Sequence, residues 1–82
     1  MLLGAFSGRL GLMFKEYDVV ALKREVPGIP IPASTHGTVL LVLPSTPMHY
    51  EVEFSDDKGN FFPDTYSVSE DDLTLIWEYD GR

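Results

Sequence analysis

Residues 36–60 read HGTVLLVLPSTPMHYEVEFSDDKGN, which is two apolar-rich runs separated by a proline-flanked loop and closed by an acidic turn. In the second run, HYEVEF (49–54), the side chains of Tyr50, Val52 and Phe54 alternate with polar ones. A period of two residues is typical of a strand that buries one face, and a glycine-containing turn such as SDDKGN joins antiparallel strands. The stretch therefore predicts a β-hairpin.

The first run, HGTVLLVL, is apolar on both of the faces that a strand would present. One predicted face carries Val39, Leu41 and Leu43, and the other carries Leu40 and Val42. Only one of these faces can line the core, and a large exposed apolar face marks an interaction site. We therefore expect the chain to form a homo-oligomer, with Leu40 and Val42 in the contact.

The remaining segments predict three more strands, a long loop and one helical turn. β-rich composition indicates strands over 16–22, 61–68 and 73–79. Three prolines make 23–35 a long loop, because proline lacks an amide donor and fixes its own φ. SEDD (69–72) has the spacing of a capping box, enough for one turn of helix. This order predicts an all-β fold, a small SH3-like five-stranded barrel with one short helical turn before the last strand.

The chain of 82 residues has room for one domain, which we expect to span residues 13–82. Residues 1–12 are apolar but contain three glycines and are too short to span a bilayer. They are either an upstream extension or an arm that packs on a neighbouring subunit through Leu2, Leu3 and Phe6.

The balance of charge limits the classes of partner. Thirteen acidic residues against six basic ones give a net charge of −7, and the basic residues are scattered. Nucleic acids and anionic membranes are disfavoured, because both need a Lys/Arg stripe. The acidity either only keeps the protein soluble or steers it to a basic partner. In the second case we expect an acidic rim formed by Asp56, Asp57, Glu70 and Asp71.

The sequence carries little that predicts chemistry. There is no cysteine, which excludes disulfides and thiolate metal sites and is compatible with the cytoplasm. His36 and His49 lie at opposite ends of the predicted hairpin, so a metal site would need further ligands. Ser45 and Thr46 lie in a proline-rich loop, where hydroxyls make turns. We therefore expect no enzyme activity, no metal and no cofactor.

Aromatic residues are more numerous than a core of this size needs. We expect Tyr50, Phe54 and Trp77 to be core residues, with Leu73 and Leu75 on the same strand face as Trp77. Phe61 and Phe62 are consecutive, so at least one of them must face outward. A candidate aromatic groove for a peptide is formed by Tyr17, Phe61, Phe62 and Tyr66.

Four segments together resemble a known family. FKEYDVVALKREVP, HGTVLLVL, HYEVEFSDDKGN and DDLTLI are similar in order and spacing to the short bacterial proteins of domain of unknown function 4926. The resemblance covers about residues 14–76. It departs from the family pattern at residues 34–37, where Ser-Thr-His-Gly replaces Gly-Asp-x-Gly, and residues 1–12 have no counterpart. It implies an SH3-like barrel without enzyme activity, in a group often found beside toxin or mobile-element genes.

These observations favour a non-catalytic protein-interaction module of the bacterial cytoplasm. It would be an immunity or antitoxin-type protein that presents an acidic face to a basic partner. The alternative is a small-molecule or peptide-binding barrel that uses an aromatic pocket, and a structural subunit of a larger enzyme is a third hypothesis.

Removal of residues 1–12 is expected to lower the mass of the assembly in solution, because these residues are expected to contribute to the contact between subunits. Light scattering of the full and shortened chains measures this mass. An equal mass for both chains would contradict a role for these residues in assembly.

Overall fold

The computed structural model describes residues 13–81, and this range is all-β with one turn of 3-10 helix. Within it, no helix is long and apolar enough to cross a membrane. Residues 1–12, with the predicted contact residues Leu2, Leu3 and Phe6, lie outside the described range. In chain order the elements are β1 (Val19–Leu22), β2 (His36–Leu43), β3 (His49–Ser55), β4 (Phe61–Ser69), η2 (Glu70–Asp72) and β5 (Leu73–Trp77).

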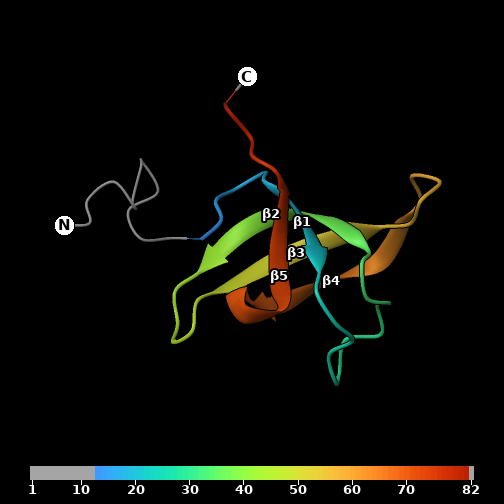
Figure 1. Ribbon diagram of the computed structural model, residues 1–82, viewed down its shortest axis with the longest axis horizontal. Helices are drawn as coiled ribbons and strands as arrows, with labels where there is room; N and C mark the ends of the chain where they lie inside the picture. Colours follow the sequence, from blue (N-terminus) through green and yellow to red (C-terminus); the bar gives the residue numbers. More distant parts are fainter. Residues whose placement is uncertain (1–12, 82) are drawn as a thin grey trace.

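The five strands form one antiparallel sheet in the order β4-β3-β2-β1-β5. This confirms the prediction of an all-β fold with five strands and a helical turn before the last one. The sheet is open, because no pairing joins β4 to β5 and these two strands are its edges. Figure 1 shows β5 and β1 crossing the longer strands β2 and β3 at a steep angle. The strands therefore lie in two layers.

The hydrophobic core lies between these layers. In β3, Tyr50, Val52 and Phe54 are fully buried, and the residues between them are only partly buried, which confirms the predicted alternation. Ile31 anchors the long loop 23–35 in the same core. The buried cluster draws on both layers and consists of Phe14, Val20, Leu22, Ile31, Val39, Tyr50, Val52, Phe54, Val68 and Leu73.

A β-bulge in β2 overturns the predicted alternation of that strand. The register passes from Val39 opposite Val52 to Leu41 opposite Glu51, which leaves Leu40 without a partner in β3. One extra residue moves the side chains after it to the other face. Val39 is therefore buried while Leu41 is 51% exposed, and these two residues do not share a face as predicted.

The pairing of β5 with β1 also contains a register shift. Val19 lies opposite Trp77 and Val20 opposite Leu75, so Ile76 is the extra residue. Only Leu73 is buried in this strand, and Trp77 is 53% exposed. The prediction that Trp77 belongs to the core is therefore wrong, because β5 leaves the core after its first residue.

Gly37 sets how closely β2 packs against β3. A Cβ atom at this position would lie 2.5 Å from Cγ1 of Val52 and 2.9 Å from Cδ1 of Phe54. We expect Gly37→Ala to lower the free energy of unfolding by about 1–3 kcal/mol, because buried neighbours must shift. Chemical denaturation measures the change. Thr38→Ala, which alters the next residue of the strand, is the control and should cost less than about 1 kcal/mol. Equal losses of unfolding free energy in the two variants would contradict close packing at Gly37.

Candidate functional site

The carboxylate of Asp18 is fully buried and joins two distant parts of the chain. Its Oδ2 accepts a hydrogen bond from the Lys15 backbone N–H at 3.0 Å. Its Oδ1 accepts from the Lys15 ammonium at 2.9 Å and from the Tyr79 backbone N–H at 2.9 Å. A buried charge is costly unless it is paired and hydrogen-bonded, and here both conditions are met. Asp18 therefore fixes the start of the segment that follows β5.

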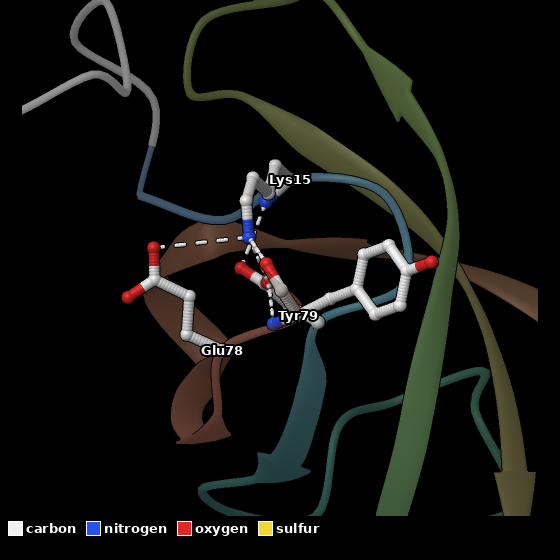
Figure 2. Close-up of polar contacts among 4 residues, drawn as sticks. Lys15, Glu78 and Tyr79 are labelled. Atoms are coloured by element: carbon white, nitrogen blue, oxygen red, sulfur yellow. Dashed lines mark hydrogen bonds and ion pairs between the residues drawn. The ribbon is translucent and has the colours of Figure 1, made fainter. Parts of the chain in front are cut away.

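The ammonium group of Lys15 completes this junction. It donates to the backbone carbonyl of Tyr79 and lies 3.7 Å from Oε2 of Glu78. Figure 2 shows the group between these partners, with the ring of Tyr79 pointing away from it. The backbone of Asp18 also accepts a hydrogen bond from the Val39 N–H at 2.9 Å, so β2 is tied to the same point.

The junction brings two copies of the tripeptide Glu-Tyr-Asp together, at residues 16–18 and 78–80. The rings of Tyr17 and Tyr79 meet edge to face with 5.4 Å between their centres. Trp77 contacts the ring of Tyr79 in the same way, at 6.2 Å. Tyr17 has a φ of 72°, which is unusual for a bulky residue, and its backbone N–H donates to Val39 at 2.7 Å. The structure therefore holds Tyr17 against its own conformational preference.

These residues border a shallow hollow of about 770 Å³. Three carboxylates lie around it, those of Glu16, Glu78 and Asp80, beside the two tyrosine rings and Val42. The only basic side chain in the lining is Lys15, which is paired with Asp18. We call this feature the aromatic–acidic hollow. Aromatic faces and nearby carboxylates both attract cations, so it is suited to an ammonium or guanidinium group.

The structure places only one residue of the predicted aromatic groove at this hollow, namely Tyr17. Phe61, Phe62 and Tyr66 lie in β4, at the opposite edge of the sheet from β5. Phe61 is 64% exposed, which confirms that one of the two consecutive phenylalanines faces outward. Phe62 and Tyr66 pack against the core. The four residues are thus not brought together into one groove.

The predicted acidic rim is divided between the two ends of β4. Asp56 and Asp57 precede this strand in the β3–β4 turn, and Glu70 and Asp71 follow it in η2. A strand of nine residues spans roughly 25 Å, so the two pairs are well separated. The four carboxylates therefore do not form one patch.

Asp56 has a structural role within its turn. Its Oδ1 accepts hydrogen bonds from the backbone N–H groups of Asn60 and Lys58, both at 2.9 Å, and its Oδ2 lies 3.4 Å from the Asn60 side-chain amide. The bond from the Asn60 backbone is the main reason that the pKa of Asp56 lies below its usual value. The Asp56 carboxylate is therefore partly occupied by hydrogen bonds within its own turn.

The residues predicted for self-association in β2 are half-buried. Leu40 lies at the bulge, and Val42 packs against the core and borders the hollow. The more exposed leucine of this strand is Leu41. Their role in assembly stays a prediction.

The two histidines do not approach each other in the sheet. His36 is exposed, and it begins β2 opposite Ser55. Nδ1 of His49 lies 3.0 Å from Oγ of Ser45 and 2.9 Å from the Pro47 carbonyl oxygen, which Ser45 also contacts at 2.7 Å. This arrangement shapes the loop 44–48. Across residues 13–81, no group of three or more His, Cys, Asp or Glu side chains could hold a metal ion.

Sequence reasoning missed most residues of the hollow. The sequence does not distinguish Glu16, Glu78 and Asp80 from the other acidic residues. It also predicts a core position for Trp77, whose ring contacts Tyr79 of the hollow. One signal was available, since Glu-Tyr-Asp occurs twice, once before the first strand and once after the last. Because β1 and β5 pair antiparallel, the residues before β1 and those after β5 must lie at the same end of the sheet.

Comparison with known proteins gives one match. The model of a family described as "Domain of unknown function (DUF4926)" matches residues 16–73, which includes all of β1 to η2 and the first residue of β5. No curated protein and no solved structure is detectably similar to the chain.

Lys15→Met is expected to lower the free energy of unfolding by about 3 kcal/mol, because it leaves the buried carboxylate of Asp18 without its cation. This is the low end of the range for buried pairs, since Lys15 itself is partly exposed. Lys23→Met removes an exposed lysine and is the control. Urea denaturation compares the two variants, and equal stability would contradict the importance of the pair.

Acid is expected to remove a contribution of Asp56 to stability. Its pKa in the folded protein lies below the usual value of 3.8, so the ionised form stabilises the fold. This contribution is present above about pH 3.8 and is lost as the pH falls further towards the folded-state pKa. Asp56→Asn should therefore reduce the acid sensitivity of unfolding, measured by denaturation on both sides of that pH, and Asp57→Asn is the matched control. An identical pH dependence in Asp56→Asn and the parent would contradict this role.

Proposed function

Because the chain belongs to the family described as domain of unknown function DUF4926, which assigns no activity, we propose a function from the geometry of its surface. The protein is a non-catalytic protein-interaction module that binds a cationic segment of a partner protein. The observation that carries this proposal is the aromatic–acidic hollow. There, the carboxylates of Glu16, Glu78 and Asp80 lie beside two tyrosine rings, the exposed one of Tyr17 and the half-buried one of Tyr79. The one ammonium group in the lining, that of Lys15, pairs with Asp18 and also lies 3.7 Å from Glu78.

The strength expected of such a site is modest. A cation over an exposed aromatic ring contributes about 0.5–1 kcal/mol, and an exposed ion pair contributes about 0.2–1 kcal/mol. One basic side chain in the hollow is therefore not enough for tight binding, and further contacts must contribute. The net charge of −7 would mainly raise the association rate and select against acidic partners.

A basic partner also fits the role of an immunity or antitoxin-type protein, which neutralises another protein by covering it. We propose this role for the protein, and we also propose that it is cytoplasmic and self-associates. The acidic pairs Asp56–Asp57 and Glu70–Asp71 would then contribute long-range attraction rather than one contact surface.

The fold itself is proposed to be an SH3-like barrel. The strand order, the long loop 23–35, the short loop 44–48 and the single turn η2 before the last strand support this assignment. So does the shared core, since β1 and β5 bury Val20, Leu22 and Leu73 against the residues of β2–β4.

A small-molecule or peptide-binding pocket is the alternative, and it would use the same rings. The hollow is shallow and wide open, whereas sites for small molecules enclose most of their ligand. This favours a protein segment as the occupant. A salt titration separates the two hypotheses, because a ligand held by apolar contacts stays bound at high ionic strength.

Charge reversal at the hollow is expected to weaken binding of an arginine-containing peptide. Glu16 is exposed, so Glu16→Lys changes the charge without disturbing the core, and we expect a roughly fivefold weaker affinity. Fluorescence of Trp77, the one tryptophan, reports binding because it lies beside Tyr79. Asp57→Lys is the matched control in the β3–β4 turn.

The two variants also locate the site. Weaker binding by Asp57→Lys alone would place the cationic segment at the β3–β4 turn and contradict the hollow. No binding of the peptide to the parent protein at low salt would contradict the proposed function.

A further inference from the structure

The outer edge of β5 is a second feature that can bind a protein segment. Among residues 13–81, β5 pairs only with β1, so one side of its backbone has no strand beside it. Five consecutive residues, 74–78, are exposed. An unpaired edge offers a row of backbone N–H and C=O groups to any extended chain, and peptides are often recognised by adding a strand to such an edge.

The two edges of this sheet differ in how well they are protected. β4 carries Pro63 and Asp64, and both residue types discourage pairing at an edge. β5 reads LTLIW, with no charge and no proline. Its side chains Leu75, Ile76 and Trp77 are 41%, 47% and 53% exposed. The sheet is thus protected at one edge and open at the other.

A second copy of the chain fits this edge poorly. If two β5 strands paired antiparallel about Leu75, the acidic turn η2 before each strand would lie near Glu78 and Asp80 of the other copy. Arg24 is paired with Asp72, but it leaves Glu70 and Asp71 uncompensated at this end. Like charges brought close together repel, which is destabilising. The edge is therefore complementary to a strand with a neutral centre and basic ends.

We propose that a cationic partner segment binds along β5 in extended form, as an added strand, and places a basic side chain in the aromatic–acidic hollow. This inference rests on the proposed function and specifies how the partner binds. The added strand would supply backbone hydrogen bonds, which the hollow alone does not provide. The hollow would supply the preference for a positively charged segment.

The position of the hollow relative to β5 makes this combination geometrically simple. β5 ends at Trp77, and residues 78–80, which border the hollow, follow directly. A strand advances about 3.3 Å per residue, so a partner residue one or two positions beyond Trp77 lies beside this segment. The contact between Trp77 and Tyr79 makes the exposed apolar surface of β5 continuous with the rings of the hollow.

The test uses the full chain and the peptide Arg-Thr-Val-Thr-Val-Thr-Arg, which has a neutral centre and basic ends. Two matched peptides accompany it, one N-methylated at its central residues and one with Gln in place of both Arg. Affinity is measured by titration with NMR, and amide exchange of residues 74–77 is measured with and without peptide. We expect protection of these amides, and at least about tenfold weaker binding of the N-methylated peptide.

A pair of variants localises the effect. Ile76→Lys adds to β5 the kind of charge that protects edges and should weaken binding about tenfold. Phe61→Lys makes the same change at an exposed apolar residue of β4 and should leave binding unchanged. Equal loss in both variants would overturn the assignment to β5.

The remaining outcomes separate this inference from the proposed function. Equal binding of the methylated and unmethylated peptides overturns strand addition but leaves the cationic site standing. If the Gln peptide binds as tightly as the Arg peptide, the proposal of a basic side chain in the hollow is overturned. No binding of any peptide overturns both proposals. Protection of residues 74–77 that appears without peptide and rises with protein concentration overturns the inference in favour of a second copy.

Discussion

The ion pair between the buried carboxylate of Asp18 and the partly exposed Lys15 is the interaction on which the candidate site depends. A fully buried carboxylate must be matched by donors, and here they come from the turn before β1 and from the segment after β5. This requirement fixes the C-terminal segment against the rest of the domain and brings Tyr79 to Tyr17. The ammonium group of Lys15 is shared between the buried Asp18 carboxylate and Glu78, so it offsets part of the negative charge at the border of the hollow.

Two of the three irregularities of strand register affect which apolar side chains reach the surface. The bulge in β2 exposes Leu41, and the one in β5 contributes to the exposure of Ile76 and Trp77. The sequence predicts one buried face in each of these strands, with Val39, Leu41 and Leu43 together in β2 and with Leu73, Leu75 and Trp77 together in β5. Natural sheets usually protect such edges, and here the protection is found on β4 alone. The result is a continuous surface along β5 that leads into the hollow.

Local patterns predicted the elements of this fold well but not its surface. The alternation around Tyr50 and Phe54, the prolines of the long loop and the Ser-Glu-Asp-Asp turn are short-range signals, and the structure contains the elements that they predict. The irregularities of β2 and β5 leave no comparable local signal, so the faces of β2 and the place of Trp77 were predicted wrongly. Asp18 looked like one of thirteen acidic residues, because its burial depends on a partner more than sixty residues away. The family match agrees with the sequence resemblance, and the function stays a proposal.

Hydrogen exchange of the Tyr79 amide tests the central claim most directly. This N–H donates to the buried Asp18 carboxylate, and it lies beyond the last strand, where chain termini usually fray. If Asp18 fixes the C-terminal segment, the amide exchanges only when the whole domain unfolds, with an opening free energy equal to that of β3. Exchange at the rate of an unstructured peptide would show that the segment is not fixed and that the hollow is not a permanent feature of the domain.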